Sequence, residues 1–276
     1  MNKENIYERI YDYCSIPGKT ANKNGFVVPK RVKAIQKILS EAGIPHTLES
    51  FMGRTFNNFY HNIYCTGNSS LCFTAHHDIT GASAGANDNS ASVINLIALK
   101  MNRPDATVVF LDGEEVGGIG SELFAEEINK GSFPKTKSIL NLELTGLGGK
   151  RFFIEKQTGS TISELIRRMP EFDYGLGLPV PEIMPPFNDA VVFRQHNIDS
   201  IVINPLPPLL PGGATREYFP KKDITFSDGT PLDYTIVSRC NGRKDTIDTI
   251  STADMKEFVE EVLVPIFDTW QSTYPS

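Results

Sequence analysis

Three short apolar runs, each ending in polar residues, mark the middle of the chain. They are the segments Leu71–Ala75 (LCFTA), Thr107–Leu111 (TVVFL) and Ser138–Leu142 (SILNL). Each is too short for a helix, and together they are rich in β-branched and aromatic residues, which is typical of buried strands. The pattern therefore predicts three strands that the rest of the chain places side by side.

A histidine and several carboxylates follow these runs. His76 ends the first run, Glu114 and Glu115 follow the second, and Glu143 follows the third. Asp88 stands at the start of the next helix, across a Gly/Ala/Ser-rich loop. If the strands are parallel neighbours, these side chains meet at one edge of the sheet, and their repulsion then calls for a cation. Imidazole and hard oxygens without a thiolate suit zinc, manganese or cobalt.

Helical and strand patterns alternate along the remaining chain. Apolar spacing predicts helices near residues 6–14, 32–42, 89–101, 121–129, 161–169, 189–196 and 251–270, the last kinked at Pro265. Further strands are predicted at 46–51, 59–64, 151–155, 200–203 and 233–238. This alternation predicts an α/β fold, a three-layer α/β/α sandwich with a central, mainly parallel mixed sheet. No repeat or linker interrupts it, so we expect residues 1–276 to form a single catalytic domain.

Composition narrows the classes of function. A net charge of −6, with 40% hydrophobic and 22% charged residues, is ordinary for a soluble globular protein and argues against a nucleic-acid partner. No apolar run approaches the roughly 20 residues of a membrane span, and the N-terminal residues lack the apolar core of a signal peptide. The four cysteines show no C-x-x-C spacing. We expect a cytoplasmic protein that acts on a peptide or small molecule, without a membrane partner, and the oligomeric state stays open.

Each candidate side chain also has a purely structural interpretation. His76 and Asp78 share a face of an extended chain, so Asp78 can fix the tautomer of a metal-bound His76; the alternative is a buried histidine satisfied by its neighbour. Asp88 can be a helix N-cap as well as a ligand. Glu114 and Glu115 can form a solvated turn. At a strand end, one of them can instead bind a metal while the other takes a proton from metal-bound water.

The chain resembles the co-catalytic two-zinc aminopeptidases and their relatives, which include bacterial leucyl aminopeptidase and the glutaminyl cyclases. The resemblance is carried in the expected order by TAHHD, GANDNSAS, FLDGEEVGGIGS, NLELTG, FNDAVVF and KDTIDTI, and it covers most of the chain. It implies that His76 is a metal ligand oriented by Asp78. It also implies that Asp88 bridges two metals, with an Asp88–Asn89 peptide that is often cis in the family.

The same resemblance assigns roles to the remaining acids, and the chain departs from the family's pattern at one position. It implies Glu114 as the general base, Glu115 as a ligand of one metal, and Glu143 as a ligand of the other. The family's last ligand is a histidine upstream of the DTID-like stretch, but this chain has Asn241 there, in SRCNGRKDTIDTI. An amide oxygen is a weak zinc ligand beside imidazole, so we expect the metal that Glu115 serves to be weakened or absent. Cys240 could substitute through a shift of one residue.

These observations lead to three hypotheses. The first is a metal-dependent exopeptidase, an aminopeptidase in which Glu114 activates a metal-bound water, with one or two zinc ions or with cobalt or manganese. The second is a single-zinc acyltransferase of the glutaminyl cyclase type. The third is a non-catalytic binding protein with a degraded metal site. Residues 171–187 and 205–222, which are proline-rich and irregular, are the expected walls of a substrate pocket.

Overall fold

The strands form one mixed sheet. The structure is a computed structural model that describes residues 5–17, 28–53, 58–80, 83–133, 135–172, 182–183, 187–205 and 245–275. In these residues eight strands pair in the order β1-β2-β4-β3-β5-β8-β6-β7. Their bounds are β1 (Thr47–Met52), β2 (Phe59–Cys65), β3 (Leu71–His76), β4 (Thr107–Leu111), β5 (Ser138–Leu142), β6 (Phe152–Glu155), β7 (Glu182–Ile183) and β8 (Asp199–Pro205).

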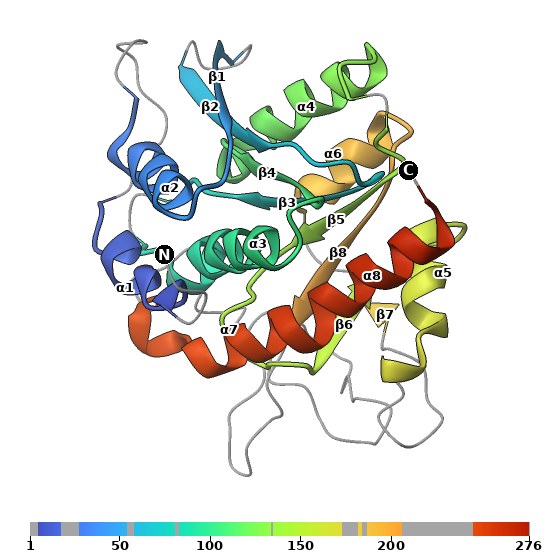
Figure 1. Cartoon of the computed structure of the whole chain (residues 1–276). Coiled ribbons are helices and arrows are strands. Elements are labelled where there is room, and N and C mark those ends of the chain that lie inside the picture. The colour runs from blue at the N-terminus through green and yellow to red at the C-terminus, as the bar shows by residue number, and fades with distance from the viewer. Residues whose placement is uncertain are drawn as a thin grey trace, which may run out of the picture.

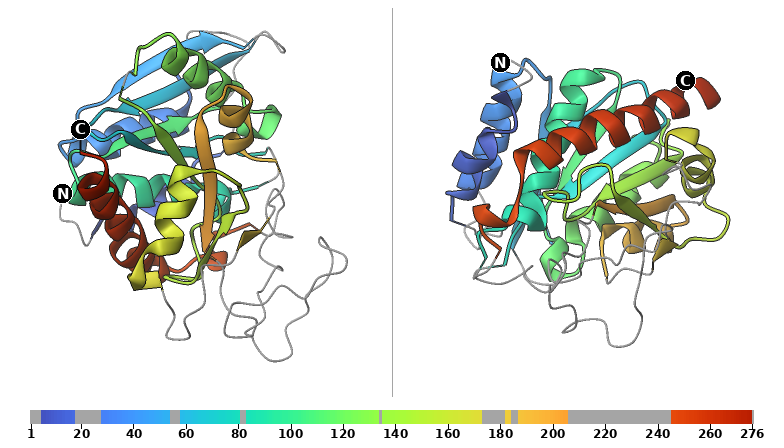
Figure 2. Two further views of the ribbon diagram at one scale, coloured as in Figure 1. Left: turned by 90° about the vertical axis from the view of Figure 1, so that its right-hand side faces the viewer. Right: turned by 90° about the horizontal axis from the view of Figure 1, so that it is seen from below.

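Helices cover both faces of this sheet (Figures 1 and 2). One face carries α1 (Arg9–Cys14), α2 (Lys30–Glu41), α3 (Ala91–Asn102), α5 (Thr161–Arg168), α7 (Thr252–Phe258) and α8 (Val264–Thr273). The opposite face carries α4 (Ile119–Asn129) and α6 (Asp189–Gln195). The expected α/β/α sandwich is therefore confirmed, with the larger apolar core on the face of α3 and α8.

The three central strands are parallel neighbours. Strand β3 pairs with β4 on one side and β5 on the other, with Thr74 opposite both Val109 and Asn141. The pairing of β5 with β8 is also parallel, whereas β1, β2 and β6 add antiparallel pairs. The carboxyl ends of β3, β4 and β5 consequently lie at one edge of the sheet, as the apolar runs predicted.

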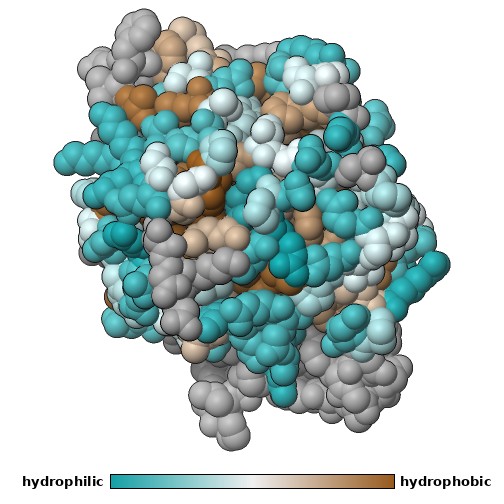
Figure 3. Space-filling view, viewed as in Figure 1, coloured by the Kyte–Doolittle hydropathy of each residue, from teal (hydrophilic) through white to brown (hydrophobic). Residues whose placement is uncertain are grey.

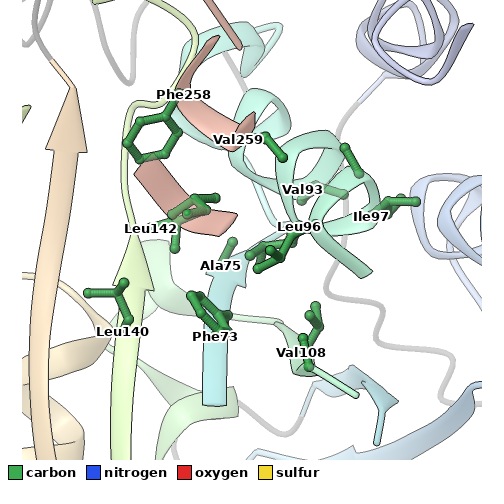
Figure 4. Packing of buried hydrophobic residues seen from close by; sticks show 14 of the residues in the cluster. Phe73, Ala75, Val93, Leu96, Ile97, Val108, Leu140, Leu142, Phe258 and Val259 are labelled. Atoms are coloured by element: carbon green, nitrogen blue, oxygen red, sulfur yellow. The ribbon is translucent and has the colours of Figure 1, made fainter. Parts of the chain in front are cut away.

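The core between the sheet and α3 fixes where that edge lies. Phe73 and Ala75 of β3 pack with Leu140 of β5 and with Leu96 of α3 (Figure 4). Phe258, at the end of α7, lies in the same cluster. All five side chains are fully buried, and complete burial of a large apolar side chain stabilises a fold by about 1.5–3 kcal/mol. Helix α3 is thereby held against β3, with its first turn beside the strand's last residue.

The sequence predicted a strand and a helix near the C-terminal end, at residues 233–238 and 251–270. The strand expected at residues 233–238 lies outside the described residues, as does most of the loop at 205–222. The helix expected at 251–270 is present, but a π-helical turn, Val259–Leu263, precedes Pro265. Proline has no N–H to donate, so the helical hydrogen bonding changes where the sequence predicted a kink.

The surface in the view of Figure 1 is mostly hydrophilic, with small separate apolar patches (Figure 3). None of the described helices is long and apolar enough to cross a membrane.

Two polar side chains are satisfied inside the core at a distance from the strand ends. Lys100, near the end of α3, is buried and donates to the carbonyl oxygens of Thr66, Pro104 and Ala106 at 2.6–2.8 Å. Trp270 of α8 is 1% exposed, and its Nε1 donates to Ser70 Oγ at 3.0 Å, just before β3 begins. These contacts tie the two helices to the amino-terminal side of the sheet.

We expect Lys100→Met to destabilise the fold by roughly 1–3 kcal/mol, because it leaves the carbonyl oxygens of Thr66, Pro104 and Ala106, the last of them buried, without their charged donor. The shift of the urea midpoint measures this loss. Lys37→Met is the matched control, since Lys37 is exposed and pairs with Glu41 on the surface; it should change stability by less than about 0.5 kcal/mol. Equal midpoints for both variants would contradict the role given to Lys100.

Candidate metal centre

Three predicted ligands meet at the edge of the sheet. His76 is the last residue of β3 and is 1% exposed. Its Nε2 lies 3.2 Å from Oδ1 of Asp88 and 3.3 Å from Oε2 of Glu143. One ligand atom from each of the three residues lies within 4.8 Å of the others. We call His76, Asp88 and Glu143 the ligand triad.

The chemistry of the ligand triad fits a divalent cation. Burial acts to lower the pKa of His76, but the charges of Glu143, Asp78 and Asp88 raise it well above its ordinary value. Burial also raises the pKa of Glu143. A cation bound here would neutralise the carboxylates and accept the lone pair of the imidazole nitrogen. One imidazole and two carboxylates are a ligand set expected for zinc or a similar ion.

Asp78 connects His76 to the turn that carries the two glutamates. Its Oδ1 lies 3.4 Å from His76 Nδ1, the nitrogen that does not face the ligand triad. The same carboxylate accepts the backbone N–H groups of Glu114 and Glu115 at 3.2 and 3.1 Å. This geometry suits the orienting role predicted for Asp78.

Glu114 and Glu115 lie in a short 3₁₀ turn, Glu114–Val116, between β4 and α4. The turn begins after Gly113, whose φ of 81° is left-handed and whose added Cβ would lie 2.9 Å from the ring of Tyr60. Only glycine fits there.

Both glutamates have raised pKa values. Burial, together with the neighbouring acids Glu143, Asp189 and Asp78, raises the pKa of Glu114 to about 10 against the lowering effect of His76. Burial and the charge of Asp88 raise the pKa of Glu115 to about 8. Glu115 is thus electrostatically coupled to Asp88, but it is not a member of the ligand triad. Its role as a ligand stays a prediction.

The loop that carries Asp88 is held by a residue for which the sequence analysis predicted no role. Asp245, which is 1% exposed, accepts the backbone N–H groups of Asn87 and Asp88 at 2.8 and 3.1 Å. Ser83 Oγ donates to the same carboxylate at 3.3 Å. Asp245 begins the DTIDTI stretch, so the motif was visible in the sequence, although its contact with residues 87 and 88 was not.

Two asparagines orient Glu143. Asn141 Nδ2 donates to its Oε1 and Asn89 Nδ2 to its Oε2, both at 3.0 Å. The Asp88–Asn89 peptide is cis, as the family resemblance implied. Asn89 therefore connects the segment of one triad member to the side chain of another.

Two further titratable residues, Asp189 and His77, are fully buried. Asp189 lies at the start of α6, and burial raises its pKa to about 7 against the lowering effect of the charge of His76. The FNDAVVF motif contains it, but its proximity to the ligand triad was not predicted. His77 contacts a different strand, with Nε2 2.7 Å from the carbonyl oxygen of His61, and burial lowers its pKa to about 4. Asn241 and Cys240 lie outside the described residues.

Known sequences match parts of this chain. The chain matches Peptidase family M28 over residues 58–264, about three quarters of its length. Two vacuolar membrane proteases, from Vanderwaltozyma polyspora and Eremothecium gossypii, are 34% identical over 99 residues and 30% identical over 112 residues. These segments are 33% and 36% of this chain, and the chain spans only about a tenth of the length of either relative.

Solved structures share the fold at low identity. The LapA aminopeptidase of Legionella pneumophila has a TM-score of 0.67 at 12% identity, covering 98% of this chain and 70% of that chain. The glutaminyl cyclase of Porphyromonas gingivalis has a TM-score of 0.68 at 14% identity, covering 97% and 98%. A zinc aminopeptidase from Bacillus subtilis has a TM-score of 0.53 at 18% identity, covering 79% and 50%.

The expected cytoplasmic location is wrong on this comparison, because both curated relatives are named vacuolar membrane proteases. The physical reason is that modest acidity and cysteines without C-x-x-C spacing are equally compatible with a domain on either side of a membrane.

The family match supports a hydrolase in general, and with the ligand triad it supports a metal cofactor. The order of the motifs, the strand-end carboxylates and the match over residues 58–264 agree: this chain belongs to peptidase family M28.

Proposed function

We propose that the chain is a metal-dependent aminopeptidase, an exopeptidase that removes N-terminal residues from peptides. One observation carries the proposal: the ligand atoms of His76, Asp88 and Glu143 converge, and the charges of His76 and Glu143 act on the partly buried carboxyl group of Glu114. The names of the aminopeptidases that share the fold support the choice of substrate.

The roles of the residues follow from their positions. A metal ion held by His76, Asp88 and Glu143, zinc being the first choice, would polarise the scissile carbonyl group and acidify a water molecule. A cation bound beside Glu114 would lower the pKa of its carboxyl group, so that Glu114 takes the proton of the attacking water and passes it to the leaving amine. Asp78 keeps His76 Nδ1 engaged, so that Nε2 points to the ligand triad.

The direct test is hydrolysis of aminoacyl-anilides by protein loaded with zinc, cobalt or manganese. Release of the aniline with at least one metal, abolished by chelation, is the expected result. A folded, metal-loaded protein that turns over none of a panel of aminoacyl-anilides would count against the proposal.

A second candidate is cyclisation of N-terminal glutamine by a single metal ion. The ligand triad is one compact group, and the glutaminyl cyclase neighbour is almost fully covered by this chain. Product analysis on a Gln-initiated peptide separates the two reactions, because cyclisation releases ammonia whereas hydrolysis releases free glutamine.

Glu114→Gln should lower kcat by about 10²–10⁴-fold, because it removes the proton acceptor and leaves the ligand triad intact. Metal content by atomic emission should stay at the wild-type value. Glu122→Gln, on α4 with a half-exposed carboxylate near His196, is the control and should keep full activity. Wild-type turnover by Glu114→Gln would remove Glu114 from the mechanism.

Chelation should lower the melting temperature of the wild type, since an ion that binds only the native state stabilises it by about 2.7 kcal/mol at 100 times its Kd. His76→Ala should lower the metal content to a small fraction of that of the wild type and should show no further loss on chelation. An unchanged melting temperature for the wild type would favour the reading as a binding protein with a degraded site.

A further inference from the structure

A buried arginine joins the two segments that carry the first two triad members. Arg31 lies in the first turn of α2 and is 1% exposed. Its Nε donates to the carbonyl oxygen of His77 at 3.3 Å, and its Nη2 donates to Ser90 Oγ at 2.7 Å. His77 follows His76 directly, and Ser90 lies two residues after Asp88. One guanidinium group thus spans the end of β3 and the turn that opens α3.

The third side of the guanidinium is fixed by α1. Its Nη1 lies 3.4 Å from the carbonyl oxygen of Tyr13, and its Cζ lies 4.1 Å above the Tyr13 ring. Stacking on an aromatic ring holds the plane of the group and leaves the N–H donors directed outward. The two N-terminal helices are therefore packed against the segments of the ligand triad through one side chain.

Burying the charge of Arg31 costs the folded protein free energy. Among the described residues, no carboxylate lies within ion-pair distance of the guanidinium group, and a buried charge without such a partner carries a desolvation penalty. A lysine could supply the charge, but its ammonium cannot reproduce two donors held at a fixed angle in one plane. The planar arrangement of the guanidinium N–H donors, and not the positive charge alone, therefore links the two segments.

We propose that Arg31 is a positioning residue for the metal centre. By tying the carbonyl oxygen of His77 to the hydroxyl of Ser90, it keeps His76 Nε2 and Asp88 Oδ1 at the separation that lets both bind one ion. This inference rests on the proposed metal site. It extends that site to α2, which lies outside the residues 58–264 that match the family.

The test measures metal affinity directly, by competition for Zn²⁺ with a chromophoric chelator. Arg31→Lys and Arg31→Met should each bind Zn²⁺ about 10–100-fold more weakly than the wild type, as expected for loss of a group that orients ligands. Lys100→Met is the matched control, because Lys100 is a buried cation at the opposite end of α3. It should lower stability and leave the affinity for Zn²⁺ unchanged.

The lysine variant separates position from charge. A nearby positive charge alone would oppose metal binding, so a purely electrostatic role predicts tighter binding by Arg31→Met and no change for Arg31→Lys. Either that pattern or wild-type affinity in both variants would overturn the inference. If Arg31→Met fails to fold, Ser90→Ala replaces it, with an expected loss of about 5-fold in affinity. A wild-type affinity in Ser90→Ala would then overturn it.

A double variant adds a second check. Ser90→Ala combined with Arg31→Lys should bind Zn²⁺ no more weakly than Arg31→Lys alone, because both changes remove the same contact. Additive losses would overturn the proposed link. If the wild type binds none of Zn²⁺, Co²⁺ and Mn²⁺, both this inference and the proposed function fail, whereas normal wild-type binding of Zn²⁺ with unaffected Arg31 variants overturns this inference alone.

Discussion

The structure depends on holding several carboxylates and one imidazole together in a buried place where they repel one another unless a cation is shared. Several of the acids in and around this place are therefore held by hydrogen-bond donors. Asp78 accepts two backbone N–H groups, Glu143 accepts two asparagine amides, and Asp245 holds the backbone beside Asp88. Such a set of fixed donors keeps ligands aligned, as the hydrogen-bond partners of metal ligands do in other metal proteins.

The topology makes this concentration of charge possible. Strand β3 lies between β4 and β5, and all three run in the same direction. Three segments that are far apart in the sequence thus end at one edge, while their apolar residues fill the core behind it (Figure 4). The separation between stable core and reactive edge is the usual arrangement of open α/β sheets, and it lets the site vary without loss of the fold.

The sequence predicted this arrangement where local signals were strong. Runs such as TVVFL are short, rich in β-branched residues and end sharply, so the strands were placed correctly, and His76 and Glu143 do lie close together where two of them end. The partners of those acids were not predictable, because nothing in the local pattern says that Asp245 contacts residue 88 across 157 positions. Arg31 was missed for the same reason, since within a helical pattern it reads as a solvated residue. Ordinary charge and cysteine spacing do not indicate a cellular compartment, which is why the expected location was wrong.

The position of the only tryptophan has a practical meaning for spectroscopy. The indole of Trp270 is bonded to Ser70, at the start of the strand whose far end is His76. Six residues of extended chain separate the two ends, a distance of about 20 Å. Intrinsic fluorescence of this protein therefore reports the integrity of the sheet and α8. A ligand bound at the edge that holds the ligand triad is too far from Trp270 to quench it by contact. Unfolding can thus be followed by fluorescence without a contact effect from a ligand bound at that edge.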